Sequence, residues 1–353
     1  MILPAGFETP AVLIDEAIAE RNIHSAQAQF DALGIRLRPH IKTHKLVAFA
    51  RKQIAAGATG ITCQKLTEAE VFIRAGFADV LITYNLCGAE KLARLRQLSA
   101  LARIAVVADG PTVVGGLAAA FLDAPARLEV LVECDTGGRR CGVQSPGAAA
   151  DLARHIAHSP RLAFGGLMTY PAPDMHGEVE AFLAQARDLC MASAGACPTI
   201  TSGGTPSMAT FPGSQVITEY RPGTYIYNDR SLISRGSARL EDCALRVAAT
   251  VVSRPTPERA ILDAGSKTLS SDLLGQVGYG LLPDYPGAVI TGLSEEHAHV
   301  DLSGATGRPA IGDVITIIPN HACVVTNLTD HVYLHRGGGP AVRTRVDARG
   351  LVW

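Results

Sequence analysis

The amino-acid sequence predicts a (β/α)8 barrel of the TIM type followed by a smaller all-β domain. From about residue 11 to 235, short apolar runs alternate with amphipathic segments, which is typical of β-α-β units with a parallel sheet. Eight such runs in a stretch of this length match the strand number and size of a (β/α)8 barrel. After about residue 240 the pattern changes to strand-like runs joined by Gly, Pro and Asp turns. We therefore expect a barrel domain over residues 1–238 and a β domain over residues 239–353.

The predicted elements follow the chain in order. The barrel strands are expected at Ala11–Ile14, Ile35–Ile41, Gly60–Gln64, Val80–Tyr84, Ile104–Ala108, Leu128–Glu133, Phe164–Tyr170 and Ile200–Ser202. Helical patterns between them include Glu16–Leu33, Thr67–Ala75, Ala89–Leu98, Pro146–His158 and Gly177–Ala192. The strands of the β domain are expected at Ala244–Val252, Arg259–Asp263, Ala288–Leu293, Ala298–Leu302, Asp313–Ile318 and His331–Leu334. A doubly wound sheet is the alternative for the first part, but no G-x-G-x-x-G motif follows the first run.

The composition is that of a soluble enzyme. With 353 residues, 47% of them hydrophobic, the chain is long enough for one large and one smaller core. A net charge of −1 gives no electrostatic reason to expect nucleic acid or an anionic membrane as partner. We see neither a signal peptide nor a run of about 20 apolar residues. The eight cysteines are scattered without a CxxC pair, which predicts reduced thiols, a cytoplasmic location and no closed structural zinc site.

The segment Arg38-Pro39-His40-Ile41-Lys42-Thr43-His44-Lys45, at the end of a predicted barrel strand, is the most informative for chemistry. Strand alternation would place Arg38, His40 and Lys42 on one face. Barrel enzymes act at the carboxyl ends of their strands. An amine near other cations loses its proton more readily, as a Schiff-base lysine requires. Lys42 and His40 are therefore candidate catalytic residues, and a solvated basic loop is the alternative.

The ends of later predicted strands carry groups suited to a flat, phosphorylated ligand. Asp135-Thr136-Gly137-Gly138-Arg139-Arg140-Cys141-Gly142 follows one strand, and Tyr170 ends the next, where its ring could stack on a cofactor or simply pack. Two later segments combine glycines with hydroxyl side chains: Thr201-Ser202-Gly203-Gly204-Thr205-Pro206-Ser207 and Glu219-Tyr220-Arg221-Pro222-Gly223-Thr224-Tyr225. Glycines let the backbone approach an anion, and phosphate is often bound late in a barrel. The pair of segments therefore predicts a phosphate site, with ordinary turns as the alternative.

In the predicted β domain, His321-Ala322-Cys323 comes shortly after an apolar strand. An imidazole and a thiolate two residues apart can bind one soft or borderline divalent metal such as Zn²⁺. Two protein ligands leave coordination positions open, which suits a catalytic ion. The alternative is a buried cysteine beside a turn histidine.

Together these motifs resemble the fold-type III pyridoxal-phosphate enzymes of the alanine racemase family, and most closely their D-threonine aldolase and D-serine dehydratase branch. The segment 38–45 resembles the signature of that branch, and His321-x-Cys323 resembles its metal pair. Asp263-Ala264-Gly265-Ser266-Lys267 and Glu295-Glu296-His297 add to the likeness, which extends over essentially the whole chain. The resemblance implies a barrel of the alanine racemase type, pyridoxal 5′-phosphate (PLP), a divalent metal (Zn, Mn or Mg), a small-molecule D-amino acid substrate and a homodimer.

The resemblance also assigns roles to residues. Lys42 would hold PLP through an imine, Arg140 would lie near the phenolic oxygen of the cofactor, and Tyr170 would pack over its pyridine ring. The residues that would contact the phosphate or other parts of the cofactor are Gln64, Gly203, Gly204, Thr205, Gly223, Thr224 and Tyr225. Arg221 matches the arginine that faces the pyridine nitrogen in racemases. Glu219 shares its predicted strand face, so the sequence leaves open which of the two faces that nitrogen.

Two departures from the racemase pattern disfavour racemisation. Glu133 stands where the racemase loop has a lysine, and the racemase's second base, a tyrosine, has no clear counterpart. A metal on His321 and Cys323 could instead act on the β-hydroxyl of a D-amino acid. Deprotonation of that hydroxyl would favour cleavage to glycine and an aldehyde. Loss of hydroxide, after Lys42 removes the α-proton, would give a 2-oxo acid and ammonia.

The sequence leaves these two reactions open. Cys323 resembles the dehydratase pattern, whereas Thr326-Asn327-Leu328-Thr329-Asp330 resembles the aldolase branch. We expect a D-threonine aldolase-like lyase, with dehydration of D-serine or 3-hydroxyaspartate as the alternative. A non-catalytic PLP carrier is the hypothesis from another class, and it is disfavoured because a carrier needs neither a β domain nor a metal. The substrate side chain, the metal and the choice of His40 or His44 as proton carrier stay open.

Overall fold

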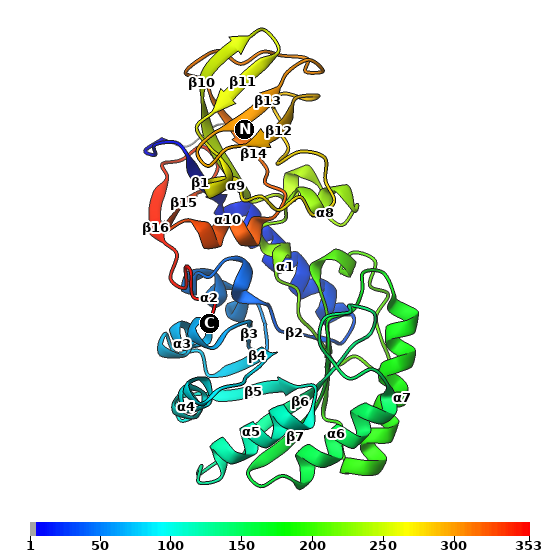
Figure 1. Cartoon of the computed structure of the whole chain (residues 1–353). Coiled ribbons are helices and arrows are strands. Elements are labelled where there is room, and N and C mark those ends of the chain that lie inside the picture. The colour runs from blue at the N-terminus through cyan, green and yellow to red at the C-terminus, as the bar shows by residue number, and fades with distance from the viewer. Residues whose placement is uncertain (1–4) are drawn as a thin grey trace. The chain divides into compact units, whose positions relative to one another are not determined.

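The computed structural model of the chain describes residues 5–353, which form two compact units (Figure 1). The barrel unit comprises Ser25–Lys42, Val47–Gly223 and Leu351–Trp353. The β unit comprises residues 5–24, Thr43–Leu46 and Thr224–Gly350. Each unit therefore combines distant segments of the chain, whereas the predicted domains 1–238 and 239–353 are consecutive. Within residues 5–353 no helix is long and apolar enough to cross a membrane.

Eight parallel strands form the wall of the barrel, in the order β2-β9-β8-β7-β6-β5-β4-β3. The strands are β2 (Arg36–Leu37), β3 (Ile61–Cys63), β4 (Asp79–Asn85), β5 (Arg103–Ala108), β6 (Leu128–Cys134), β7 (Leu162–Thr169), β8 (Thr199–Ser202) and β9 (Glu219–Tyr220). The ring closes just after β2, where His40 forms a parallel bridge with Thr62 and the Thr62 amide donates to the Pro39 carbonyl at 2.8 Å. The predicted (β/α)8 class is confirmed.

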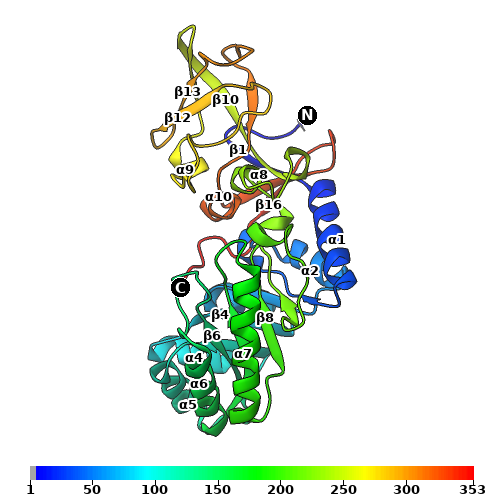
Figure 2. The same cartoon turned by 90° about the vertical axis from the view of Figure 1, so that its right-hand side faces the viewer.

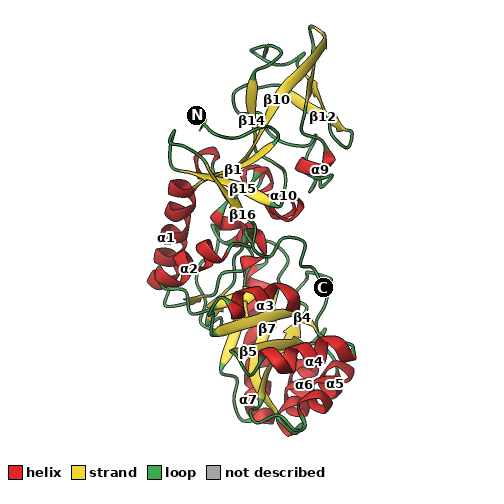
Figure 3. Ribbon diagram, turned by 90° about the vertical axis from the view of Figure 1, so that its left-hand side faces the viewer, coloured by secondary structure: helices red, strands yellow, loops and turns green. Residues whose placement is uncertain are grey.

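Helices cover the outside of this sheet (Figures 1 and 3). They are the second half of α1 (Glu16–Ala32), α2 (Val47–Ala55), α3 (Leu66–Arg74), α4 (Ala89–Leu98), α5 (Pro111–Phe121), α6 (Pro146–His158) and α7 (His176–Ala194), of which α6 and α7 lie side by side (Figure 2). The first turns of two of these helices contain residues that favour helix starts. In α6 the Ser145 hydroxyl accepts from the Ala148 amide, and Pro146 occupies the first turn, where its missing N–H does no harm. In α5 Pro111 has the same place after Gly110.

The interior of the barrel is built from layers of inward-facing side chains. Leu81, Val107, Leu131 and Met168 pack together as an apolar middle layer. Because strand side chains alternate with a period of two, residues two or four positions earlier face the amino-terminal end of the barrel. That layer is ionic and contains Arg38, Asp79, Arg103, Glu129 and Glu219. Residues two positions later, such as Glu133, face the carboxyl-terminal mouth.

The β unit contains one mostly antiparallel sheet in the order β12-β13-β11-β10-β1-β15-β16, with β14 also paired to β10. The strands are β1 (Ala11–Asp15), β10 (Leu245–Thr256), β11 (Arg259–Leu262), β12 (Val289–Leu293), β13 (Ala298–Asp301), β14 (Val314–Ile317), β15 (His331–His335) and β16 (Val342–Arg345). Three short helices accompany them: α8 (Arg230–Ser234), α9 (Ser266–Leu269) and α10 (Ala322–Leu328). The predicted C-terminal β domain is thereby confirmed as a fold class.

Two details of the predicted barrel are wrong. Ala11–Ile14 is a strand, but it pairs with β10 and β15 in the β unit, and the eighth barrel strand is β9. The predicted strand Ile35–Ile41 is a strand only at Arg36–Leu37, and Ile41–Thr43 forms a 3₁₀ turn instead. Pro39 lacks the N–H group that a continuing ladder would use. Lys42 therefore does not lie on an alternating strand face with Arg38 and His40.

Candidate active site

Lys42 lies in the 3₁₀ turn that follows the closing bridge of the barrel, at the carboxyl end of β2. The backbone before it is held from two sides: the His40 amide donates to the Pro222 carbonyl at 2.9 Å, and Thr62 donates to Pro39 on the other side. The bridge thus determines where the lysine leaves the barrel wall. This is the end of the barrel at which enzymes of this architecture place their chemistry.

His40 is buried, and hydrogen bonds engage both of its ring nitrogens. Nε2 lies 3.1 Å from Oε1 of Gln64, whose own NH₂ group donates to the Thr83 carbonyl at 3.0 Å. Gln64 must therefore accept from His40, which puts the ring proton on Nε2, and Nδ1 accepts from the Lys42 amide at 3.4 Å. Burial holds the pKa of His40 well below its usual value, and the charges of Lys42 and other nearby cations lower it further. His40 is consequently a neutral, engaged imidazole rather than an available base.

Arg221 and Glu219 face the barrel interior at different heights. Glu219 is buried in the lower ionic layer, where its Oε2 accepts from Nε of Arg38 at 2.9 Å. Arg221, two residues nearer the mouth, donates from Nε to the Thr201 hydroxyl at 2.8 Å and from Nη2 to the Thr169 carbonyl. Burial lowers the pKa of Arg221 to about 10, although Glu219 and other carboxylates oppose the shift. Arg221 therefore stays positively charged at neutral pH, close to the ends of β7 and β8.

Arg140 and Tyr170 meet at the mouth. The Arg140 guanidinium carbon lies 4.7 Å from the centroid of the Tyr170 ring, and one of its nitrogens is 3.9 Å from the buried Glu133 carboxylate. The loop between β6 and Arg140 is shaped by Asp135, whose Oδ1 accepts from the amides of Gly137 and Arg139 at 3.0 Å. Arg139 itself is exposed.

The glycine segments predicted to bind phosphate lie next to each other at the ends of β8 and β9. Gly203 and Gly204 have φ values of +145° and +146°, and a Cβ on Gly203 would lie only 2.5 Å from the Arg221 amide nitrogen. A Cβ on Gly204 would lie 3.3 Å from the Tyr170 ring. The Thr205 hydroxyl accepts from the Gly223 amide at 3.2 Å, which links the two segments. This cradle, open only because side chains are absent, fits a phosphorylated flat cofactor between a lysine and an aromatic ring.

Thr224 and Tyr225 begin a short 3₁₀ helix, Thr224–Ile226, in the β unit. The Tyr225 side chain is buried. The Thr224 hydroxyl lies 3.4 Å from Sγ of Cys323, and the Thr43 hydroxyl lies 3.1 Å from the same sulfur. Thr43 directly follows Lys42 in the chain, and Thr224 directly follows Gly223.

His321 and Cys323 lie together at the start of α10, as a metal-binding pair requires. His321 caps the helix and hydrogen-bonds through its side chain to Cys323. Its Nδ1 lies 2.7 Å from Oδ2 of Asp272. Burial lowers the pKa of His321, but Cys323, Asp272 and the buried Asp229 raise it by more, to about 9. Residues 5–353 contain no cluster of three or more His, Cys, Asp or Glu side chains arranged around one metal position.

The donor chemistry nevertheless fits a two-ligand catalytic metal. Asp272 engages Nδ1 of His321, which leaves Nε2 for a metal ion, and a carboxylate behind the metal-binding histidine is the usual arrangement. A third protein ligand is not needed where substrate and water complete the coordination. Sequence reasoning missed Asp272 because it lies in a loop with no ligand spacing to His321. It also missed Thr43 as a partner of the thiol.

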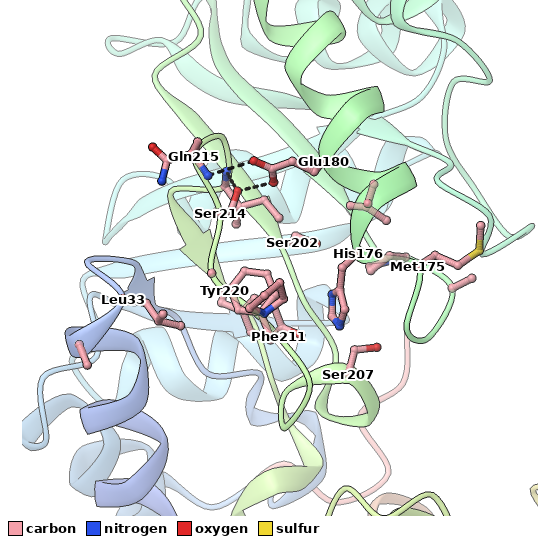
Figure 4. Close-up of a pocket in the computed structure, with 18 residues that line it drawn as sticks. Leu33, Met175, His176, Glu180, Ser202, Ser207, Phe211, Ser214, Gln215 and Tyr220 are labelled. Carbon is pink, nitrogen blue, oxygen red and sulfur yellow. Dashed lines mark hydrogen bonds between the residues drawn. The ribbon is translucent and has the colours of Figure 1, made fainter.

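A pocket of about 510 Å³ lies beside α7 and the segment that joins β8 to β9 (Figure 4). Its walls are α7 and the segment between β8 and β9, and its lining includes Phe211, Tyr220 and Glu180. Glu180 is satisfied by Ser214 and by the amide of Gln215 (Figure 4). The connection from β8 to β9 contains no α-helix, and the pocket lies where one would cover the sheet. We attribute it to this missing helix and not to the catalytic site.

Comparison with known proteins agrees with the geometry. The family model "Alanine racemase, N-terminal domain" matches residues 14–231, and the model "Putative serine dehydratase domain" matches residues 244–335. The chain belongs to the alanine racemase-like family. A D-threonine aldolase of an Arthrobacter species is 34% identical over 366 residues, covering 98% of this chain and 94% of the relative. A D-threo-3-hydroxyaspartate dehydratase of Delftia sp. (strain HT23) is also 34% identical, covering 90% of this chain and 91% of the relative.

The fold of the chain is likewise that of a solved member of this family. A D-threo-3-hydroxyaspartate dehydratase mutant in the metal-free form matches with a TM-score of 0.88 and 31% identity over 98% of each chain. The relatives are aldolases and dehydratases, so the chain is a lyase of this family. The predicted resemblance to the D-threonine aldolase and dehydratase branch is confirmed.

Proposed function

We propose that the chain is a PLP- and divalent-metal-dependent lyase that cleaves β-hydroxy-D-amino acids to glycine and an aldehyde, as a D-threonine aldolase does. Family membership and 34% identity to an aldolase over nearly the whole chain support this reaction class. The observation that carries the proposal is the His321–Cys323 pair with Asp272 behind it. Neither a racemase nor a PLP carrier needs such a pair.

PLP, in this proposal, is bound through Lys42, with its phosphate in the cradle of Gly203, Gly204, Thr205, Gly223, Thr224 and Tyr225. When bound there, PLP would supply electron withdrawal from the bonds at Cα of the substrate, and a metal held by His321 and Cys323 would supply a Lewis acid for the β-hydroxyl. Tyr170 would cover the ring, and Gln64 would act indirectly by holding His40. Of the expected metals Zn, Mn and Mg, the imidazole and thiolate of this pair favour Zn, because Mg and Mn prefer oxygen ligands.

We infer that Arg221, and not Glu219, faces the pyridine nitrogen. Arg221 lies nearer the mouth and donates to Thr201 and Thr169, whereas Glu219 is occupied by Arg38 in the layer below. A positively charged guanidinium leaves the pyridine nitrogen unprotonated, which moderates the electron demand of the cofactor. Arg140 would lie near the phenolic oxygen.

We infer that Lys42, once released from the cofactor, moves the proton at Cα. His40 is the other predicted catalytic residue, but both of its nitrogens are engaged and its pKa is lowered. Its role would be to hold the turn that carries Lys42. Lysine amines serve as proton carriers when neighbouring cations lower their pKa.

Dehydration is the second candidate reaction, and it has its own support. The relative from Delftia is named a dehydratase at the same identity as the aldolase, and Cys323 resembles the dehydratase ligand pattern. D-Serine or 3-hydroxyaspartate would then be the substrate, with a 2-oxo acid and ammonia as products. We further propose that the protein is a cytoplasmic homodimer, as the family resemblance suggests. A net charge of −1 gives no reason to expect nucleic acid or a membrane as partner.

The cofactor and metal assignments can be separated experimentally. Reduction of the PLP-loaded protein with borohydride, followed by peptide mass spectrometry, should place the pyridoxyl group on Lys42. His321→Ala should keep the absorbance of bound PLP but lose turnover of D-threonine. Full activity of that variant in the presence of a chelator would refute the metal assignment, and a pyridoxyl group on another lysine would refute the cofactor assignment.

A further inference from the structure

Asp229 is a buried carboxylate in the β unit, close to the His321–Cys323 pair. It lies between the 3₁₀ helix Thr224–Ile226 and α8, and it is only 1% exposed. Within residues 5–353 it forms no ion pair with a lysine, arginine or histidine. A buried charge without a partner cation is unfavourable unless hydrogen bonds compensate it. The groups that its two oxygens hold therefore indicate its role.

The two carboxylate oxygens hold two different segments of the chain. Oδ1 accepts from the Ser231 hydroxyl at 2.6 Å and from the Leu232 amide at 3.2 Å, so Asp229 is the N-cap of α8. Oδ2 accepts from the Ala322 amide at 3.1 Å. Donors engage both oxygens, which is the pattern of an ionised carboxylate. A side-chain amide or a single hydroxyl could not accept at both ends.

Ala322 is the residue between the two proposed metal ligands and the first residue of α10. An amide at this place has no partner within its own helix. His321 occupies the N-cap position of α10, but its side chain makes no capping hydrogen bond. Asp229 therefore supplies, from outside the helix, the acceptor that the cap residue does not. This contact fixes the peptide from which the imidazole and the thiol both project.

Two further observations connect Asp229 with the metal pair. The amide of Arg230, the next residue, donates to the Pro319 carbonyl at 3.0 Å, so the two segments are joined at two points. The charge of Asp229 also reaches His321: burial lowers the pKa of this imidazole, and Asp229 is among the groups that raise it. A negative charge that favours a protonated imidazole also favours a divalent cation at the same place.

We propose that Asp229 is a positioning residue of the metal site. Its carboxylate holds the peptide between His321 and Cys323 in place, and it adds a buried negative charge beside the bound cation. The proposal rests on the proposed function, in which these two residues bind a divalent metal. Without Asp229 the two ligands would have to be ordered when the metal binds, and metal affinity would fall.

The test compares two substitutions of Asp229 with a matched control. Asp229→Asn removes the charge and one of the two acceptors. Asp229→Ser keeps a good N-cap for α8 but loses both the charge and the contact with Ala322, so it separates helix capping from the proposed role. The control Ser231→Ala removes one hydrogen bond to Oδ1 and leaves the charge and the Ala322 contact intact.

Co²⁺ is the probe, because its visible absorption reports the arrangement of its ligands. In the PLP-loaded protein, competition with a chromogenic chelator should show a Co²⁺ dissociation constant that is roughly 10–100-fold higher in both Asp229 variants. The spectrum of bound Co²⁺ at saturation should change in both. Ser231→Ala should keep the wild-type affinity and spectrum. Circular dichroism would verify that each variant is folded.

Three results would overturn the proposal. They are an unchanged Co²⁺ affinity in Asp229→Ser, an unchanged spectrum of bound Co²⁺ in both Asp229 variants, and an equal loss of affinity in Ser231→Ala. The last would mean that the effect arises from the cap of α8 and not from the contact with Ala322. Failure of the wild-type protein to bind Co²⁺ would instead refute the metal assignment of the proposed function, so the two failures are distinguishable.

Discussion

Replacement of Arg38 by methionine should destabilise the barrel strongly. Arg38 donates to Glu219 at 2.9 Å and to Asp79 at 2.6 Å, and the side chains of Arg38 and Glu219 are only 7% and 2% exposed. Arg38→Met would leave the Glu219 carboxylate buried without its cation. Breaking a buried ion pair in this way costs about 3–5 kcal/mol. That is a large part of the roughly 5–15 kcal/mol by which proteins are stable.

Two related variants give the expected order of effects. Glu219→Gln leaves Arg38 paired with Asp79 and keeps an acceptor for its Nε, so we expect a loss of only about 1–2 kcal/mol. Arg103→Met removes the next cation of the same ionic layer, which bridges Asp79 and Glu129 but is 58% exposed, and it should cost less than about 1 kcal/mol. Combining Arg38→Met with Glu219→Leu should recover part of the loss, because no unpaired charge remains.

The assay is urea unfolding of the apoprotein at pH 7, followed by circular dichroism. We expect the midpoint concentration to fall most for Arg38→Met, less for Glu219→Gln and least for Arg103→Met. An effect of Arg38→Met no larger than that of Arg103→Met would refute the view that Arg38 compensates a buried charge. It would also remove our reason for keeping Glu219 away from the cofactor.

Three further predictions concern the cradle, the metal pair and His40. Gly203→Ala would force a Cβ against the Arg221 backbone at a φ of +145°, which costs roughly 1–3 kcal/mol of strain. The PLP dissociation constant, measured by fluorescence, should therefore rise about 10-fold or more. The control Gly177→Ala has open space around it and should leave that constant unchanged. Asp272→Asn should weaken metal binding by roughly 10–100-fold, as measured by competition with a chromogenic chelator. Unchanged metal affinity would contradict a role for the contact between Asp272 and Nδ1 of His321. The pKa of His40 is lower in the folded state than in the unfolded chain, so the unfolded chain binds the proton at a higher pH. The contribution of the neutral His40 to stability is therefore lost as the pH falls below about 6.5. Between pH 6.5 and 5 the unfolding free energy should fall less steeply in His40→Gln than in the wild type, and equal slopes would contradict a buried neutral imidazole.

The barrel could be predicted because its apolar rhythm is strong in most units. β4, β5 and β6 lie within one or two residues of the predicted runs, and α4 and α6 match them. The number of strands was right for a partly wrong reason. β1 has the same apolar pattern as a barrel strand, and its partners in the β unit are set by contacts distant in sequence. β9 has only two residues, and no periodicity can reveal a strand of that length.

The position of the candidate site residues relative to the barrel strands could be predicted, but their geometry could not. The sequence placed Lys42, Gly203 and Arg221 at strand ends, and they lie there. It could not distinguish Arg221 from Glu219, because both face the interior, and the difference arises from Arg38, which reaches Glu219 from the end of the neighbouring strand β2. Nor could it predict Asp272 behind His321, since a loop carboxylate reaches its partner only through the fold.

The most direct test of the central claim is to identify the products formed from D-threonine by the protein loaded with PLP and a divalent metal. The account predicts glycine and acetaldehyde in equal amounts, with loss of both in His321→Ala. 2-Oxobutyrate and ammonia would contradict the aldolase assignment and establish the dehydratase. If neither pair of products formed although PLP was bound at Lys42, D-threonine would not be a substrate, and the account would be contradicted on that point.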